Sequence, residues 1–364
     1  MDQNKANKSN ITYAEAGVNI DAGNKAVELM KEEVAKTYTP AVLGDLGSFG
    51  SLYDLKYLLS EYDHPVMVQS IDGVGTKSIV AKMANDFTKL GEDLLSATAN
   101  DILVMGAKPL TLLDYIASDK IDPYNIATLV NGLAKACQNN SVALVGGETA
   151  EMPDTYLAGE HDFVGIVTGV VDKNNIIDGK NIKPGNILLG LPSSGLHTNG
   201  FSLARHLLFK LNNYDVNDKP DELAGSDIKS SLLAPHVNYQ KPVMELLDNN
   251  IKVNGMVHIT GGGLIENTPR VLPKNCGVEI DLNSWPKLPI FDLLVKLGGL
   301  KNSEAYKTFN MGIGYVFILP EDQLDAANNL LDKIGVKAYE IGKVVEFDSC
   351  DESSYQSHIV SLKI

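Results

Sequence analysis

Six consecutive residues carry the most informative chemistry in the sequence: Asp72-Gly73-Val74-Gly75-Thr76-Lys77. They follow an apolar run, Val66 to Ile71, that is typical of a short buried strand. Carboxylates bind Mg²⁺, and glycine N–H groups and a lysine ammonium can approach phosphate oxygens. The residue order differs from a Walker A loop. The segment predicts a phosphate-and-metal site; the alternatives are an ordinary Asp-Gly turn and a solvated lysine in the first turn of a helix.

Asp101 is the second acidic candidate. It lies on a helix predicted over Glu92 to Met105, on one face with Leu94, Ala97, Thr98 and Met105. A carboxylate on an apolar face must be paired or bound to a cation, because an unpaired buried charge is costly. We therefore expect Asp101 to bind metal beside Asp72. The alternative is a buried ion pair with a lysine or arginine.

Glycines mark two further loops of the first half. The loop Gly44 to Gly50 has glycines at every third position, so its N–H groups could surround an anion. Gly146-Gly147-Glu148 follows a strand predicted over Val142 to Val145, at the sheet edge where open α/β sheets bind ligands. The alternatives are a tight connecting turn and a solvated carboxylate.

Two loops of the second half have the layout of strand, glycine-containing loop, then helix. Ser194 to Gly200 offers hydroxyls, the His197 imidazole and free helix-start N–H groups to a polar ligand. His258-Ile259-Thr260-Gly261-Gly262-Gly263 resembles a second phosphate loop. For His197 the alternative is a capping or packing histidine.

Composition excludes several functional classes. The 364 residues are 44% hydrophobic, as expected of globular domains with cores, and the formal charge of −15 disfavours nucleic acid as a partner. Cys137, Cys276 and Cys350 are few and far apart, which favours a reducing compartment over a disulfide framework. Neither a secretion signal nor a membrane segment is recognisable. We expect a soluble, cytoplasmic protein.

The elements that must position these residues divide into two halves. Each half mixes strands and helices in numbers that could form one sheet covered by helices, so we predict an α/β (α+β type) fold with two mixed-sheet domains. The predicted boundaries are a flexible arm over 1–19, a first domain over 20–173 and a second over 174–364. Asp122-Pro123 is a strong helix start. A further helix is predicted over Pro235 to Asp248.

Seven blocks together resemble the phosphoribosylformylglycinamidine cyclo-ligase family, also called the aminoimidazole ribonucleotide synthetases. The resemblance runs from about Tyr13 to about Gly342. Its blocks are Tyr13 to Asn24, the Gly44 loop, Asp72 to Lys77, Asn100-Asp101, Gly146 to Pro153, Ser193 to Gly200 with His258 to Gly263, and Phe309 to Gly314.

The resemblance implies an ATP-dependent ring closure of formylglycinamidine ribonucleotide to 5-aminoimidazole ribonucleotide in purine biosynthesis. Mg²⁺ would be held by Asp72, Asp101 and Glu148. ATP would be bound by these residues with Lys31, Gly44, Gly47, Ser48, Phe49, Gly50, Thr76, Lys77, Gly146 and Gly147. The substrate would meet Ser194, His197, Thr198, Asn199, Gly200, Thr260, Gly261 and Gly262. Asp72, Lys77 and His197 are the catalytic candidates, His197 for proton transfer. The resemblance also implies a homodimer whose first-domain sheets meet.

Relatives in the same superfamily are the alternatives. A selenophosphate synthetase would carry a reactive cysteine near its N-terminus, whereas no cysteine precedes Cys137. The formylglycinamidine ribonucleotide amidotransferase is far longer. Some relatives have an aspartate where this chain has His258, which disfavours a metal ligand from the second domain. A non-catalytic nucleotide-binding regulator would lack the acidic and lysine residues that are present here.

Overall fold

A computed structural model describes residues 18–44, 46, 47, 49–347 and 360–363. The first sheet has four strands in the order β1 (Pro65–Gly73), β4 (His161–Asp172), β2 (Lys108–Ser118) and β3 (Ala143–Glu151). β1 and β2 are antiparallel to β4, and β3 is parallel to β2. The register aligns Asp72, Gly165, Asp114 and Gly147 in one row across the sheet.

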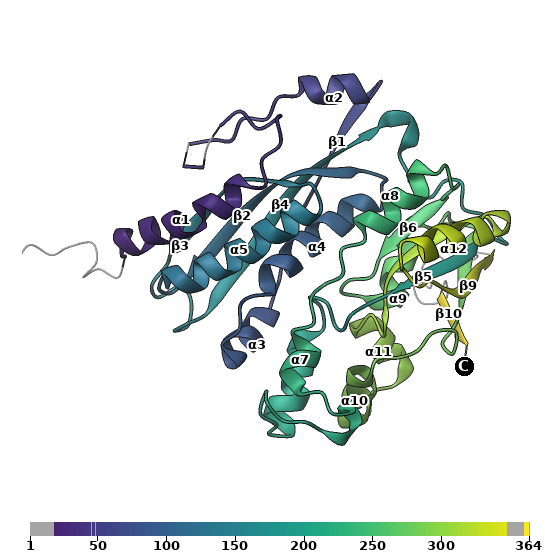
Figure 1. Cartoon of the computed structure of the whole chain (residues 1–364). Coiled ribbons are helices and arrows are strands. Elements are labelled where there is room, and N and C mark those ends of the chain that lie inside the picture. The colour runs from purple at the N-terminus through teal and green to yellow at the C-terminus, as the bar shows by residue number, and fades with distance from the viewer. Residues whose placement is uncertain (1–17, 45, 48, 348–359, 364) are drawn as a thin grey trace, which may run out of the picture.

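Helices cover one face of this sheet (Figure 1). They are α1 (Ile20–Ala35), α3 (Lys77–Ala84), α4 (Leu90–Leu103) and α5 (Pro123–Asn139). α5 begins as predicted, because the Asp122 carboxylate accepts the backbone N–H groups of Tyr124 and Asn125. On the other face, which we call the open face, Met67, Ile71 and Leu113 are exposed among the described residues.

The second sheet has six strands in the order β10 (Val360–Lys363), β7 (Cys276–Asp281), β9 (Tyr339–Glu346), β5 (Ile187–Pro192), β8 (Ile313–Leu319) and β6 (Gly255–His258). Only the pair β10 and β7 is parallel. The predicted fold class, two mixed sheets covered by helices, is confirmed. The boundary predicted at 173 falls between the two sheets.

The helices after β5 are short or interrupted. They are α6 (Phe201–Arg205), which continues as a π-helical turn (His206–Leu211), α7 (Ile228–Leu232), α8 (Gln240–Asp248), α9 (Gly263–Asn267), α10 (Pro289–Gly298), α11 (Asn302–Thr308) and α12 (Leu324–Lys333). Among the residues described, no helix has both the length and the apolar character needed to span a bilayer.

Several elements differ from the sequence expectations. The structure adds α2 (Lys56–Glu61), α7, α10, α11 and β10. Of these, α10 begins with a proline and has apolar residues at helical spacing, a signal that the sequence expectations did not use. The helix expected from Pro235 begins at Gln240, because side chains of α4 bind the backbone of the preceding segment. The N-terminal arm lies largely outside the described residues.

Candidate functional site

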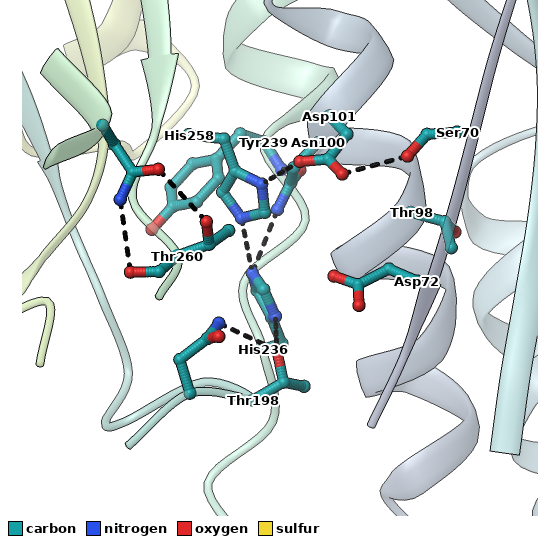
Figure 2. A network of polar contacts seen from close by, with 12 residues as sticks. Ser70, Asp72, Thr98, Asn100, Asp101, Thr198, His236, Tyr239, His258 and Thr260 are labelled. Atoms are coloured by element: carbon teal, nitrogen blue, oxygen red, sulfur yellow. Dashed lines mark hydrogen bonds and ion pairs between the residues drawn. The ribbon is translucent and has the colours of Figure 1, made fainter. Parts of the chain in front are cut away.

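The cleft between the two domains contains Asp101, near the end of α4. Its Oδ1 lies 2.8 Å from Nδ1 of His258, and its Oδ2 accepts a hydrogen bond of 3.0 Å from the Ser70 hydroxyl (Figure 2). The Asp101 side chain is 35% exposed, so a ligand in the cleft can reach it. Its partner is a histidine of the second domain, not the lysine or arginine of the alternative reading.

Asp72 lies at the end of β1, on the same side of the site as Asp101 (Figure 2). Burial raises the pKa of Asp72, and the charge of Asp101 raises it further, whereas the Gly73 N–H and His258 act in the opposite direction. Two carboxylates that repel each other are a natural pair for a divalent cation. Among the described residues, no group of three or more acidic, histidine or cysteine side chains could hold a metal without other ligands.

A chain of polar contacts continues from His258 into the second domain. Nε2 of His258 lies 3.0 Å from Nε2 of His236, and Nδ1 of His236 lies 3.4 Å from the Thr198 hydroxyl (Figure 2). Burial lowers the pKa of His236 well below its ordinary value, and the neighbouring histidines and Lys77 lower it further. The structure thus connects an acidic residue of the first domain with the Ser194–Gly200 loop of the second.

A cavity of about 480 Å³ adjoins this network. Ser70 and Asp101 line it from the first domain, and His258, Thr260 and Arg270 line it from the second. It combines carboxylate, imidazole, hydroxyl and guanidinium groups. Apolar side chains, among them Ile102, Met105 and Ile177, form much of the remaining lining, so the cavity suits a ligand with both polar groups and an apolar surface.

The two predicted substrate loops lie beside each other. A Cβ on Gly261 would come within 3.4 Å of Oδ1 of Asn199. The Ser194 hydroxyl donates to the carbonyl of Pro235, and Thr260 contacts Asn267 at 3.3 Å. Gly200 and Gly262 have φ values of 79° and 101°, which favour glycine. The structure therefore brings together loops that are about sixty residues apart in the sequence.

His197 has a different environment from the one expected of a proton-transfer residue. Its side chain is fully buried and stacks on His236 with ring centroids 4.0 Å apart. Burial lowers the pKa of His197 well below its ordinary value. These contacts fit the packing alternative, and they leave His258 as the histidine that lies beside the cleft.

Lys77 also differs from the expectation that it binds phosphate. Its side chain is 0% exposed, and its Nζ lies 2.8 Å from Oδ1 of Asp93 and 2.8 Å from the carbonyl of Ala234. An ammonium group with these partners, away from solvent, is not available to a phosphate in the cleft. Neither the phosphate role nor the solvated alternative describes this lysine.

A second, larger cavity of about 830 Å³ lies between α1, the glycine-rich loop and the edge strand β3. The expected ATP residues among its lining are Gly47, Phe49, Gly50, Gly146, Gly147 and Glu148. Lys31 is exposed on α1, whereas Met30 and Val34 of the same helix line the cavity. Gly44 is not part of the lining, and Ser48 lies outside the described residues.

Glu148 is far from the two other predicted metal ligands. It lies on β3, and β2 and β4 separate that strand from β1, which carries Asp72. Three strand spacings correspond to roughly 14 Å. The three carboxylates therefore do not converge within one chain. Glu148 belongs to the larger cavity.

Asp114 is a buried acid in the lining of the larger cavity. It is 9% exposed, and burial raises its pKa to about 7. A Cβ on Gly147 would lie 2.3 Å from Oδ1 of Asp114, so the glycine leaves the space that this carboxylate occupies. Packing against Asp114 therefore requires a glycine at position 147, and this glycine also lines the cavity.

Sequence reasoning missed three residues that the structure places at these sites: Asp93, Asp114 and His236. It named His258 only as the start of a glycine-rich loop that follows a strand. Asp93 and Asp114 have apolar neighbours in the sequence and belong to no recognised motif. The Pro235-His236 pair carries no motif.

Two family models match the chain. "AIR synthase related protein, N-terminal domain" matches residues 56–171, and "AIR synthase related protein, C-terminal domain" matches residues 183–351. Phosphoribosylformylglycinamidine cyclo-ligase of Limosilactobacillus fermentum is 44% identical over 93% of this chain and 98% of the relative. The protein of the same name from Limosilactobacillus reuteri (strain DSM 20016) is 44% identical over 91% of this chain and 95% of the relative.

Solved structures share the fold at low identity. Thiamine-monophosphate kinase from Stenotrophomonas maltophilia K279a is similar with a TM-score of 0.67 and 15% identity, covering 93% of this chain and 96% of its own. Hydrogenase maturation protein HypE in complex with ATP is similar with a TM-score of 0.65 and 17% identity. The match covers 94% of this chain and 91% of the HypE chain. The two-sheet architecture is therefore shared by proteins with different chemistry.

Proposed function

This chain belongs to the phosphoribosylformylglycinamidine cyclo-ligase family, and we propose that the cleft beside Asp72, Asp101 and His258 is where it carries out the family's reaction. The reaction is the ATP-dependent cyclisation of formylglycinamidine ribonucleotide to 5-aminoimidazole ribonucleotide, with release of ADP and phosphate. The observation that supports this location is the joining of Asp101 and His258 across the domain interface at 2.8 Å.

The chemistry sets three tasks for the chain. The formyl amide oxygen accepts the γ-phosphoryl group, a nitrogen of the amidine attacks the formyl carbon to form the C–N bond, and the C–O bond breaks as phosphate leaves. The residues must orient the two reactants, exclude water and accept the proton lost by the attacking nitrogen. We assign to His258, whose two ring nitrogens contact Asp101 and His236, the task of orienting the Asp101 carboxylate. The departing phosphate can take up the proton that the attacking nitrogen loses.

The residues fit Mg²⁺ as a two-carboxylate site. Asp72 and Asp101 supply hard oxygen ligands, and Mg²⁺ commonly binds one or two carboxylates together with substrate phosphates and water. Bound Mg²⁺ would neutralise charge on the transferring phosphoryl group. Glu148 would serve ATP through the larger cavity instead of completing this pair.

We propose that ATP binds through the larger cavity. Its lining includes the backbone of Gly47, Gly50, Gly146 and Gly147, where N–H groups can meet an anion without steric hindrance. Lys31 and Gly44 lie outside the lining but near lining residues in the sequence, and we include them in the proposal; Ser48 lies outside the described residues. Phosphoryl transfer would require the γ-phosphate to reach the Asp72–Asp101 pair from a cavity whose strand β3 lies three strand spacings, roughly 14 Å, from β1.

Ser194, Thr198, Asn199 and Gly200 with the Thr260–Gly262 loop are our proposed substrate contacts. The adjacency of the two loops supports this assignment, and Thr260 lines the smaller cavity. Two residues that were expected to contact a ligand, His197 and Thr76, have a different role in this proposal. His197 would support the loop from beneath, and the Thr76 hydroxyl contacts Ser202 at 3.4 Å, which joins the two domains.

We further propose a cytoplasmic homodimer. The open face of the first sheet exposes Met67, Ile71 and Leu113, and a second copy would cover this apolar area. Cys137 and Cys276 are free and buried, as in a protein of a reducing compartment.

One assay tests the function directly. The protein is incubated with ATP, Mg²⁺ and formylglycinamidine ribonucleotide, and the aminoimidazole product is measured as a diazotisable amine. We expect product and ADP in equal amounts. ADP formation without the amine would contradict the assignment.

A further inference from the structure

A buried ion pair lies where the first domain meets the second. Nζ of Lys77, the first residue of α3, is 2.8 Å from Oδ1 of Asp93 in α4, and both side chains are 0% exposed. Burial lowers the pKa of Lys77 and raises that of Asp93, whereas each partner's charge opposes the change. The pair is therefore held against a substantial desolvation cost.

The two charged groups also bind backbone of the second domain. Lys77 Nζ donates to the carbonyl of Ala234 at 2.8 Å, and Asp93 Oδ1 accepts the N–H of His236 at 2.6 Å. These two bonds lie on either side of Pro235. The ion pair thus fixes the backbone from which the His236 side chain projects.

Asn100 extends this attachment two turns further along α4. Its Oδ1 accepts the N–H of Tyr239, and its Nδ2 donates to the carbonyl of Val237, both at 2.9 Å. We call Lys77 of α3 together with Asp93 and Asn100 of α4 the clamp. Together they bind four backbone groups of residues 234–239, which form no helix or strand before α8 begins.

The clamp holds the backbone of His236, and the ring is held in addition by stacking on His197 and by contacts with Thr198 and Asn100. With its backbone held by Asp93, the ring places Nε2 at 3.0 Å from Nε2 of His258, and the other nitrogen of His258 contacts Asp101 (Figure 2). A small shift of residues 234–236 would remove this support from His258. The ion pair is therefore coupled to the cleft through two histidines.

Stability alone is a weak explanation for this pair. Well-packed apolar residues of similar volume often stabilise a fold as well as a buried ion pair does. We propose that Lys77 and Asp93 are positioning residues, whose purpose is to hold His236 against His258. The inference rests on the proposed function only for the role of His258 in turnover.

Paired variants of Asp93 distinguish a positioning role from a purely stabilising one. In a Lys77→Met background, Asp93→Asn keeps an oxygen that can accept the His236 N–H, whereas Asp93→Leu keeps the branched shape but has bulkier methyl groups and no acceptor. We expect kcat of the leucine variant to be at least about tenfold below that of the asparagine variant, the scale of one lost hydrogen bond. The KM for ATP should agree within about threefold, because the larger cavity is untouched.

A second measurement does not depend on turnover. Hydrogen exchange of the His236 amide should be slow in the asparagine variant and at least about tenfold faster in the leucine variant. If the leucine variant fails to fold, Asp93→Ala in the same background removes the acceptor without adding volume. If the proposed function is wrong, the wild type forms no aminoimidazole product. The difference in His236 amide exchange between the two Asp93 variants would still be observed in that case.

The Lys82–Glu160 ion pair provides the matched control. Its atoms are 3.0 Å apart, it lies within the first domain and it is partly exposed. In a Lys82→Met background, Glu160→Gln and Glu160→Leu should have the same kcat. The proposal is overturned if the Asp93 variants share one kcat and one exchange rate, or if the control variants differ as much as the clamp variants.

Discussion

Asp101 is the residue on which the proposed chemistry most depends, because it meets His258, Ser70 and the proposed metal at one point. We predict that Asp101→Asn lowers kcat by about 100-fold or more while the unfolding midpoint changes little, since the amide keeps the shape but loses the charge. Steady-state rates and urea unfolding of one preparation measure both quantities. Ser70→Ala, which removes only the hydroxyl, is the control. If Asp101→Asn keeps its activity and depends on Mg²⁺ as the wild type does, Asp101 is not a metal ligand.

Asp114 makes stability depend on pH in a definite direction. Its pKa is raised to about 7 in the folded protein, above the value of about 3.9 in the unfolded chain. Between these values the folded state holds a proton that the unfolded state releases. The contribution of Asp114 to stability is therefore full below about pH 4 and is lost as pH rises toward 7, by at most about 1.4 kcal/mol per unit.

The Asp114→Asn variant tests the direction of this pH dependence. The amide does not titrate, so we predict that the variant gains free energy of unfolding relative to the wild type when the pH is raised from about 5 to about 7.5. Urea unfolding at the two pH values gives the comparison. Parallel pH dependence in both proteins would show that Asp114 does not titrate in this range.

At the scale of one element, β3 contains two adjacent glycines with unequal surroundings. A Cβ on Gly147 would lie 2.6 Å from the carbonyl oxygen of Asp114, besides its close approach to the carboxylate, whereas on Gly146 it would meet only Leu113 Cδ2 at 3.5 Å. We predict that Gly147→Ala lowers the free energy of unfolding by about 1–3 kcal/mol through overpacking. Gly146→Ala should change it by about 0.5 kcal/mol or less.

Equal effects of these two alanines in chemical denaturation would argue against a tight contact between β2 and β3 at Gly147. Binding of ATP, measured by calorimetry, gives a second comparison. The displaced Asp114 carboxylate would narrow the larger cavity, so Gly147→Ala should bind ATP more weakly than Gly146→Ala does.

At the scale of the whole molecule, the open face of the first sheet should join two copies. We predict that Ile71→Lys converts the dimer to a monomer, because two unpaired ammonium groups would be buried at a symmetric interface. Light scattering after gel filtration measures the mass. Leu211→Lys, at an exposed apolar residue of the second domain, is the control and should leave the mass unchanged. A monomeric wild type would refute the proposed dimer.

The sequence by itself determined the elements whose signals are local. β1, β4 and α5 form where the apolar runs and the Asp122-Pro123 helix start placed them, because strand and helix patterns depend on neighbouring residues. It also determined the family, since the motif blocks occur in order along the chain. The sequence also predicted Asp72 and Asp101 as neighbours. The structure places Asp101 in the lining of the smaller cavity, and Asp72 is near enough for the charge of Asp101 to raise its pKa.

Tertiary structure alone decided which partners the charged residues meet. Lys77 ends the motif that predicted a phosphate site, yet its ammonium group contacts Asp93 and the carbonyl of Ala234, because folding brings α3, α4 and the second domain together. The helix expected from Pro235 starts five residues later, since Asp93 and Asn100 bind backbone groups that a helix would otherwise use. No pattern along the chain encodes contacts between residues more than a hundred positions apart.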